Sequence, residues 1–464
     1  MRVNVMDMVT RRSFLSRSML GAAALSFPSL LVPDSEAQQL RERASSRKSF
    51  EVVSVESTTL KVPYREIPNR AMSRELPHWK WTEILEVKLK SGVSGYGETL
   101  LYYTWGVSDQ EGIQRCIGKN AAELMWDDSL GAGLQMALFD AVARQLELPV
   151  HRLLGRKVHK KTPLSWWNID TSAKDMASEC LTAYQQGYLS YKTKGRPWFD
   201  IYQQVDLSAK AIPESFKIDM DFNSTLLDAD RGMTIIKDLE QYPQVDIYES
   251  PIPQSDVEGN RRIREATRVN IALHYGTPKP RAVVEEGVCD GFVVGGGASS
   301  VMRQASFCSE VDMPFWLQLV GTGLTAAYSL HFGGVCHQAI WPAVNCHQLY
   351  SHDLLKQPIK VNKGQAEVPD TPGIGHDLDW EMVERYRVEK PAARPNPRRM
   401  VEVSWPSGKR MLLAATEVNF VLNAANRGEI PYYERGADTR MLPDDGTEQW
   451  AELFEKAKQA PLTL

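Results

Sequence analysis

The sequence predicts an α/β fold in which short strands alternate with helices, as in a (β/α) barrel. Between residues 162 and 341, brief apolar runs alternate with segments of helical periodicity. Three of these runs end in a charged residue: Asp221 follows Lys194 by 27 residues, and Glu249 follows Asp221 by 28. Each interval has the length of one strand, loop, helix and loop. Because the C-terminal strand ends of a barrel converge, we expect these three side chains to meet at one mouth.

The first residues predict an export signal. Arg11-Arg12 precede an apolar stretch from Met19 to Val32, and the small-x-small sequence Ser35-Glu36-Ala37 follows. This order is typical of a twin-arginine signal peptide over residues 1–37; the alternative is a chance pair of arginines beside an apolar N-terminus. The stretch is too short to span a bilayer comfortably. We therefore expect a periplasmic or otherwise extracytoplasmic protein without a membrane span in its mature form.

Length and charge narrow the function classes. The 464 residues are enough for two domains, and a sequence pI near 6.2 gives no reason to expect a nucleic-acid partner. The six cysteines form no CxxC pair or other metal-type spacing. Twin-arginine export carries proteins that folded in a reducing compartment, so we expect buried free thiols. If any bridge forms, Cys336 and Cys346 are the favoured pair.

Residues 50–155 predict an α+β domain. Strand-like patterns cover residues 51–62 and 79–89, and Gly95-Tyr96-Gly97-Glu98 is expected to form a turn after the second strand. A helix is expected over residues 131–146, because Leu134, Ala137, Leu138, Val142 and Leu146 recur on one stripe.

Seven barrel strands are expected after this domain. They are Pro163–Ile169, Tyr188–Lys194, Phe216–Phe222, Val245–Glu249, Asn270–His274, Gly291–Val294 and Pro314–Leu319. The chain turns basic and proline-rich between Lys390 and Arg399, and residues 400–464 then mix strand-like and helical stretches. This last part is expected to be an extra segment, and three roles stay open for it: covering the barrel mouth, forming an oligomer interface, or bracing the N-terminal domain.

Short motifs follow one another in a characteristic order along residues 50–385. They are Gly95-Tyr96-Gly97-Glu98; Gly133 to Asp140 with Leu148-Pro149-Val150 and Leu153-Leu154-Gly155; Lys192-Thr193-Lys194; Asp221-Phe222-Asn223; Glu249-Ser250-Pro251; and Val368-Pro369-Asp370 with Pro372-Gly373-Ile374-Gly375. In this order and spacing they resemble the enolase superfamily, in particular its mandelate racemase and muconate cycloisomerase branch.

The resemblance implies a fold and a division of the chain. The fold is a modified (β/α)₇β TIM-type barrel with an N-terminal α+β capping domain, to which this chain adds an extra C-terminal segment. The expected parts are a signal over 1–37, the capping domain over 50–155, the barrel over 156–350, a return segment to the capping domain over 351–390, and a C-terminal extension over 391–464.

The resemblance also implies roles for four charged residues. Asp221 and Glu249 correspond to the first two Mg²⁺ ligands, as hard oxygen donors. Lys194 corresponds to the general base that takes the proton α to a substrate carboxylate, with Lys192 beside it. A neighbouring ammonium and a metal ion both favour a neutral lysine. The alternative for all four is a solvated ion-pair patch.

The third metal ligand departs from the family pattern. The fifth strand should end in Asp or Glu, but the chain has His274 there, 25 residues after Glu249. An imidazole shifts preference from Mg²⁺ toward Mn²⁺, Fe²⁺ or Zn²⁺. The alternative is a histidine hydrogen-bonded at the mouth without a metal role, and Tyr275 is the weaker ligand candidate.

The opposite face of the predicted site lacks the family's usual acid or base. The sixth strand runs directly into Gly295-Gly296-Gly297, and the seventh offers Gln318 in place of a charged residue. Chemistry from the lysine face alone suits β-elimination or cycloisomerisation better than two-base racemisation. Asp290 lies at the start of its strand, the wrong end for catalysis.

Three residues near the mouth are candidates for substrate binding. Arg196 could hold a carboxylate bidentately, although a surface salt bridge is the commoner use of such a residue. Trp166 or its neighbour Trp167 could wall the substrate, although packing is the commoner use of a tryptophan. Gln318 could donate a hydrogen bond, unless it is satisfied inside the barrel.

Two functions from different classes follow. The first is an exported, metal-dependent enzyme that removes the proton α to a small-molecule carboxylate, as a sugar-acid dehydratase-like lyase or a cycloisomerase with Lys194 as base. The second is a catalytically degenerate barrel that acts as a binding or structural protein. Family members often assemble, so a homo-oligomer is expected in either case.

Overall fold

The structure is a computed structural model that describes residues 49–103 and 106–464. The predicted signal over 1–37 lies outside the described residues. Within the part of the chain that is described, no helix is both long and apolar enough to cross a membrane.

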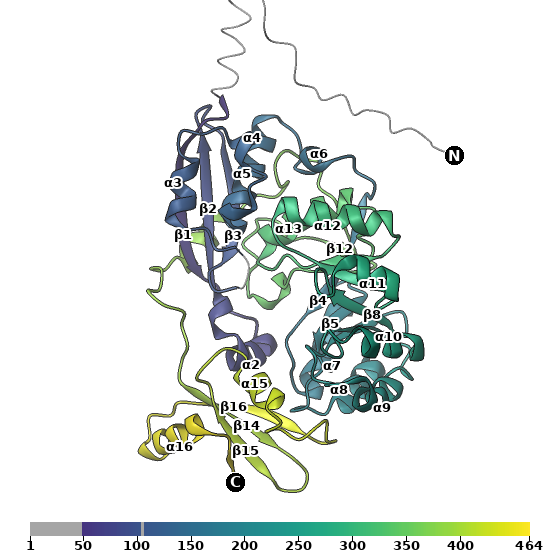
Figure 1. Cartoon of the computed structure of the whole chain (residues 1–464). Helices are drawn as coiled ribbons and strands as arrows, with labels where there is room; N and C mark the ends of the chain where they lie inside the picture. Colours follow the sequence, from purple (N-terminus) through teal and green to yellow (C-terminus); the bar gives the residue numbers. More distant parts are fainter. Residues whose placement is uncertain (1–48, 104–105) are drawn as a thin grey trace, which may run out of the picture. The chain divides into compact units, whose positions relative to one another are not determined.

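The capping region is built on a three-stranded antiparallel sheet with the order β1-β2-β3 (Figure 1). Its strands are β1 (Val52–Lys61), β2 (Trp81–Leu89) and β3 (Ser94–Leu100). Its helices are α2 (Glu66–Glu75), η1 (Pro77–Lys80), α3 (Gln110–Cys116), α4 (Ala121–Leu124), η2 (Asp128–Leu130), α5 (Ala132–Gln145) and α6 (His151–Leu154). The apolar stripe predicted over residues 131–146 is α5, which packs on β2 and β3.

The Gly95–Glu98 motif forms part of strand β3, so the expectation of a turn there is wrong. Helix α5 crosses this strand so closely that a Cβ at Gly97 would lie 1.9 Å from the carbonyl oxygen of Gly133. A Cβ at Gly95 would lie 2.1 Å from the backbone nitrogen of Ala141. The two glycines therefore allow the helix to pack closely on the sheet. Glycine within a strand often marks such a close approach of another backbone.

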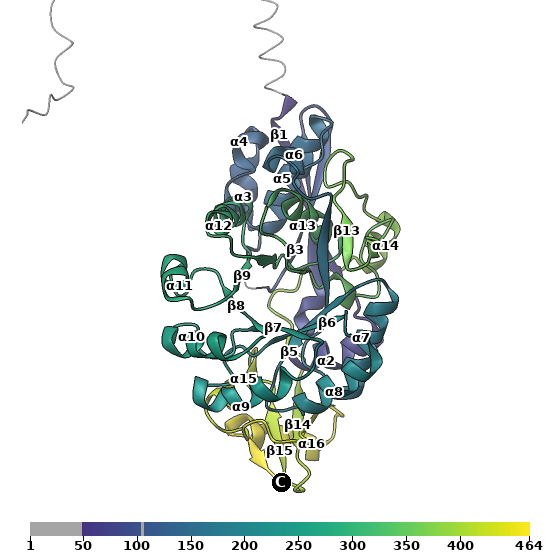
Figure 2. The same ribbon diagram turned by 90° about the vertical axis from the view of Figure 1, so that its right-hand side faces the viewer.

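The barrel consists of eight parallel strands with seven intervening helices. The strands are β4 (Lys161–Trp167), β5 (Ser190–Lys194), β6 (Lys217–Asp221), β7 (Val245–Glu249), β8 (Asn270–His274), β9 (Gly291–Val294), β10 (Phe315–Leu317) and β11 (Ala343–Val344). The helices are α7 (Ala173–Gln185), α8 (Ile201–Ala211), α9 (Ala229–Leu239), α10 (Val257–Ala266), α11 (Pro280–Glu286), α12 (Ala298–Glu310) and α13 (Gly323–Val335). Figure 2 shows α8 to α11 outside the strands β5 to β8.

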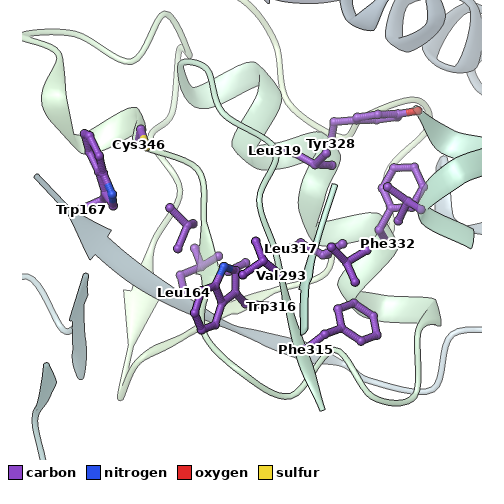
Figure 3. Packing of buried hydrophobic residues seen from close by; sticks show 14 of the residues in the cluster. Leu164, Trp167, Val293, Phe315, Trp316, Leu317, Leu319, Tyr328, Phe332 and Cys346 are labelled. Carbon is purple, nitrogen blue, oxygen red and sulfur yellow. The ribbon is translucent and has the colours of Figure 1, made fainter. Parts of the chain in front are cut away.

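The ring of strands closes through β11. Neighbouring strands pair in parallel from β4 to β10, β11 pairs in parallel with β4, and a bridge joins Gln318 after β10 to Val344 in β11. This is the (β/α)₇β topology that the sequence analysis expects. The interior is packed with large side chains, and Figure 3 shows Trp316 beside Leu164 and Val293.

Buried carboxylates connect the capping region to the barrel. Glu98 of β3 accepts hydrogen bonds from the backbone nitrogen and hydroxyl of Thr325 and from the backbone nitrogen of Thr322, at the start of α13. Asp140 of α5 accepts from the backbone nitrogens of Tyr96 and Ile374. The two carboxylates thus join segments that are far apart in the sequence. They also give hydrogen-bond partners to backbone N–H groups that would otherwise be buried without any.

The segment after the barrel returns to the capping region. It contains η3 (His347–Leu349), β12 (Val361–Asn362), β13 (Gln365–Glu367) and α14 (Trp380–Tyr386). Strand β13 pairs antiparallel with β4, and Arg387 bridges Leu60 of β1.

The C-terminal extension forms a second small sheet with the order β16-β14-β15-β17. Its elements are β14 (Arg399–Ser404), β15 (Arg410–Ala414), α15 (Phe420–Asn426), β16 (Asp438–Pro443), α16 (Glu448–Gln459) and β17 (Leu462–Thr463). Its apolar face shares a core with Trp198 and Phe199 of the barrel loop after β5. Arg399 also donates to the carbonyl oxygen of Arg74 in α2 at 2.7 Å. The extension therefore braces both the barrel and the capping region.

All six cysteines are buried and unpaired. Cys336 and Cys346 form no bridge with each other.

Candidate active site

Three of the predicted site residues lie side by side at the C-terminal ends of adjacent strands. The parallel register places Lys194 of β5 opposite Asp221 of β6, and Asp221 opposite Glu249 of β7. Adjacent strands are about 4.8 Å apart, so the side chains meet at one mouth.

The two lysines contact the two carboxylates directly. The Nζ of Lys194 forms an ion pair with Oδ2 of Asp221 and donates to Oδ1 of Asn223 at 3.1 Å. The Nζ of Lys192 forms an ion pair with Glu249 and lies 3.9 Å from Oδ2 of Asp221. The side chains of Asp221 and Glu249 are each 1% exposed, and that of Lys194 is 17% exposed. This cluster is buried, unlike a solvated surface patch.

Burial and charge act differently on the two lysines. Burial lowers the pKa of Lys194, and the positive charge of Lys192 adds to the effect, so the ion pair with Asp221 does not restore it. Burial also disfavours the charge of Lys192, but Glu249 and Asp221 together outweigh it and raise the pKa of Lys192 above its ordinary value. Lys194 is therefore the lysine that gives up its proton more easily.

His274 contacts the same cluster from strand β8. Its Nε2 lies 2.9 Å from Oε1 of Glu249, and its side chain is 47% exposed. Tyr275 packs its ring against Phe292 and Phe307, away from the carboxylates. His274 is thus the better placed of the two ligand candidates.

The donor set suits a divalent cation in its chemistry. Both oxygens of the buried Glu249 contact nitrogen atoms: Lys192 forms an ion pair with Oε2, and Nε2 of His274 lies 2.9 Å from Oε1. Carboxylate oxygens are the ligands that hard divalent cations take. As the side chains stand, however, no three carboxylates, thiols or imidazoles within residues 49–103 and 106–464 are grouped to hold one. A cation would have to take the place of the lysine contacts.

A cavity of about 490 Å³ lies above the two lysines. Its walls come from the capping region (Leu76, His78, Trp79, Tyr102, Tyr103), the barrel (Trp167, Ile169, Lys192, Lys194, Arg196, Asn223, Gln318, Val320, Val344, Cys346) and the extension (Arg394, Val418, Asn419, Leu422). Figure 3 shows Trp167 close to Cys346 on this wall. The size is typical of a small-molecule site.

A second cavity of about 390 Å³ adjoins the first and shares Tyr103, Gln318 and Val320 with it. His274 and Tyr275 line this second cavity, whereas the lysines line the first. The Nε2 of Gln318 donates to the hydroxyl of Tyr103 at 3.5 Å, and its Oε1 is buried with no partner among the described residues. Gln318 therefore has an acceptor to offer a ligand on either side.

Arg196 lies at the mouth as predicted and is buried. It donates to the carbonyl oxygen of Phe222 at 2.8 Å and to Oδ1 of Asn223 at 2.5 Å, and its Nε lies 3.9 Å from Oδ1 of Asp170. These partners, together with the ring of Trp198, hold the guanidinium at the cavity wall.

Trp166 points away from the mouth, so its assignment to substrate binding is wrong. Its Nε1 donates to Glu179 of α7 at 2.9 Å, and the guanidinium of Arg65 lies over its ring. Side chains alternate between the two faces of a strand, so the neighbouring Trp167 faces the cavity instead, where it stacks on Trp79 at 5.9 Å.

Asp219 is a further buried acid beside this cluster, and no sequence motif marks it. It lies two residues before Asp221 on the same face of β6 and accepts from the hydroxyl of Ser190 at 2.9 Å. Burial raises its pKa to about 8, which keeps it protonated near neutral pH. The period of two along the strand was the signal that could have found it.

Known proteins resemble more than half of this chain. Residues 175–382 match the family model described as Enolase C-terminal domain-like. An o-succinylbenzoate synthase from Geobacillus stearothermophilus is 24% identical over 337 residues, which cover 65% of this chain and 88% of that protein. An arabinonate dehydratase from Saccharolobus solfataricus is 22% identical over 344 residues, which cover 65% of this chain and 89% of that protein.

Solved structures share the same fold. The muconate cycloisomerase from Pseudomonas fluorescens aligns with a TM-score of 0.59 at 20% identity, covering 73% of this chain and 99% of its own. The three similar proteins are thus a synthase, a dehydratase and a cycloisomerase, and all three are enzymes.

Proposed function

Because this chain is a divergent member of the enolase superfamily, from its mandelate racemase and muconate cycloisomerase branch, we propose that it abstracts the proton α to the carboxylate of a small molecule. The observation that carries the proposal is the pairing of Lys192 and Lys194 with Asp221 and Glu249 beneath a 490 Å³ cavity. A carboxylate bound in the cavity would lie next to a base and next to the two carboxylates that we propose as metal ligands.

Lys194 acts as the base in this proposal. It is the lysine whose pKa burial lowers, and its amino group reaches the cavity. Lys192 remains charged and lies deeper, where it offsets Glu249 and helps to stabilise negative charge on the substrate. Arg196 holds a substrate carboxylate oxygen with the guanidinium N–H groups that its protein partners leave available.

Enolase-superfamily relatives depend on a divalent metal, typically Mg²⁺. In this chain Asp221, Glu249 and His274 would hold the cation, and when bound it stabilises the charge that builds on the substrate carboxylate. Two carboxylates and an imidazole would accept Mg²⁺, and also Mn²⁺, Fe²⁺ or Zn²⁺.

The one-sided distribution of bases favours elimination or ring formation over racemisation. Gln318, Val320, Val344 and Cys346 line the cavity without a carboxylate or histidine among them. We therefore propose loss of water from a sugar acid. Neutral Lys194 takes the α-proton, the bond from the β-carbon to its hydroxyl breaks as the carbon–carbon double bond forms, and the resulting ammonium returns that proton to the departing hydroxyl on the same face. A cycloisomerisation is the variant. The arabinonate dehydratase among the relatives is in line with this choice.

A non-catalytic barrel is the second candidate. Two observations favour it: His274 replaces the third carboxylate, and both lysines are engaged with the carboxylates that a cation would need. The cavity would then serve to bind an acid without converting it.

Metal-dependent stability and turnover of the mature protein test the function. We expect Mg²⁺ or Mn²⁺ to raise the melting temperature of the wild type, and the effect to disappear in Asp221→Asn and His274→Ala. The variant Lys194→Arg should keep the metal effect but lose at least about 100-fold in kcat when sugar acids are screened, because a guanidinium stays protonated.

The control for this experiment is Lys210→Arg, on the exposed face of α8, which should match the wild type in both assays. If no metal stabilises the protein and no acid is turned over, the non-catalytic binding barrel would be the remaining candidate function. Turnover that persists in Lys194→Arg would remove Lys194 from the role of base.

We also propose export by the twin-arginine route and assembly into a homo-oligomer. Export predicts that Arg12→Lys combined with Arg11→Lys retains the protein in the cytoplasm, which cell fractionation would detect. A monomer in light scattering would contradict assembly.

A further inference from the structure

The charges around the cavity are not balanced. Its lining includes four cationic side chains, those of Lys192, Lys194, Arg196 and Arg394, and no carboxylate among the described lining residues. The carboxylates of Asp221 and Glu249 lie beneath the lysines and offset two positive charges. Asp170 lies 3.9 Å from Arg196 but is also the partner of Arg74.

Arg394 forms no hydrogen bond or ion pair with any of the described residues, and its side chain lines the cavity from the start of the extension. Its positive charge acts on His78, a second lining residue, which burial keeps neutral with a pKa of about 4. The other arginines of this region are engaged: Arg399 donates to Arg74, and Arg398 pairs with Asp444.

The segment that carries Arg394 is held in place on both sides. Tyr102 donates to the carbonyl oxygens of Pro391 and Ala393 at 3.3 Å, and Arg399 anchors the following strand to α2. Asn419, at the start of α15, adds a polar group to the same wall. The extension thus contributes packing and also a charged side chain to the cavity: the backbone before Arg394 is held, and the side chain itself is exposed to solvent.

We infer that Arg394 is a specificity-determining residue that binds a second acid group of the substrate, so that the site prefers dianionic acids, such as aldaric acids, over monoacids. One carboxylate lies at Lys194 and Arg196, where the proton is removed, and the other lies at Arg394 with Asn419 beside it. The orientation of the substrate in this assignment rests on the proposed function. The preference for a substrate with two negative charges rests on the cavity alone.

Paired acids test the inference in the full mature chain. Isothermal titration with Mg²⁺ present would measure binding of several aldaric acids, each matched with the aldonic acid of the same configuration. We expect the wild type to bind at least one diacid about 10- to 100-fold more tightly than its monoacid partner. Arg394→Gln should reduce this ratio to near one, because it weakens binding of the diacid much more than binding of the monoacid.

Arg427→Gln is the matched control, because Arg427 is an exposed arginine of the same extension that pairs with Glu429 and does not line the cavity. It should keep the wild-type ratio. Equal affinities in the wild type, a preference that Arg394→Gln leaves intact, or no binding of any diacid would overturn the inference.

The outcome separates this inference from the proposed function. A diacid preference that depends on Arg394, in a protein without turnover, would support the inference and leave the chain a binding barrel. Turnover that depends on Lys194, with no role for Arg394, would support the function and reject the inference.

Discussion

Two lysines two residues apart differ in chemistry because their depths and partners differ. Lys192 is sealed between Glu249 and the ring of Trp316, whose centroid is 5.2 Å from its Nζ. Lys194 reaches the cavity, and the positive charges of Lys192 and Arg196 add to the burial that lowers its pKa. At the scale of the residue, this asymmetry supports our proposal that Lys194 is the base.

Buried histidines make the stability of this protein sensitive to acid. His331 is fully buried: its Nδ1 accepts from the backbone nitrogen of His151 at 3.1 Å, and its Nε2 donates to the carbonyl oxygen of Ile374 at 3.0 Å. Burial lowers its pKa to about 3. Both nitrogens are occupied in the neutral form, so protonation would break the contact with His151.

We predict that the free energy of unfolding falls as the pH drops from about 6.5 toward 3. In that range the unfolded chain binds a proton at His331 that the folded chain does not, so the stability present above pH 6.5 is lost on acidification. Urea unfolding at several pH values would show a slope up to about 1.4 kcal/mol per pH unit for this residue.

His331→Gln should reduce the slope of unfolding free energy against pH by up to about 1.4 kcal/mol per pH unit, which corresponds to one proton. The reason is that an amide offers an acceptor and a donor without titrating. The exposed His337 provides the control, and His337→Gln should leave the slope unchanged. An unchanged slope in His331→Gln would contradict the prediction.

At the scale of the element, the contact between β3 and α5 decides how the capping region is held. The glycines of β3 bring the helix backbone against the strand, and Glu98 from the same strand then reaches the start of α13. One short segment thereby joins sheet, helix and barrel.

We predict that Gly97→Ala destabilises the protein by about 3 kcal/mol, because the added Cβ would meet the carbonyl oxygen of Gly133 at 1.9 Å and neither backbone can give way easily. Chemical unfolding would measure the change. Gly155→Ala is the control, since a Cβ there meets nothing within 4 Å. Equal losses in the two variants would show that the close approach is not the cause.

At the scale of the whole molecule, the extension takes part in the site instead of merely following it. Tyr433 donates to the carbonyl oxygen of Gly195 at 3.1 Å and lies 2.5 Å from the hydroxyl of Thr225. These contacts hold the loops that follow β5 and β6. Lys194 and Asp221 are the last residues of these two strands. Of the three roles left open for residues 391–464, two are therefore visible: the extension lines the mouth and braces the capping region.

We predict that a mature chain ending at Lys390 is less stable by roughly 3–6 kcal/mol, because Trp198 and Phe199 would lose their apolar cover. Thermal and urea unfolding of the two chain lengths would measure this. The mature chain that keeps residues 391–464 and carries Tyr433→Phe should keep its stability to within about 1 kcal/mol, which separates loss of the core from loss of one hydroxyl. Equal stability of the two chain lengths would contradict the prediction.

Much of the fold follows from local patterns along the chain. Among the seven predicted barrel strands, Val245–Glu249, Asn270–His274 and Gly291–Val294 have the predicted bounds, and the others differ by one or two residues at one or both ends. The spacing of Lys194, Asp221 and Glu249 placed them at one mouth, because a βα unit of constant length returns each strand to the same edge.

What only the tertiary structure decided concerns orientation and distant contacts. The spacing could not tell Trp166 from Trp167, since the face that a residue takes depends on the neighbours against which the strand is set. The contact of His274 with Glu249 needed the register of two strands. Arg394 reached the cavity because the extension packs on a loop nearly 200 residues earlier, and no local pattern records such a contact.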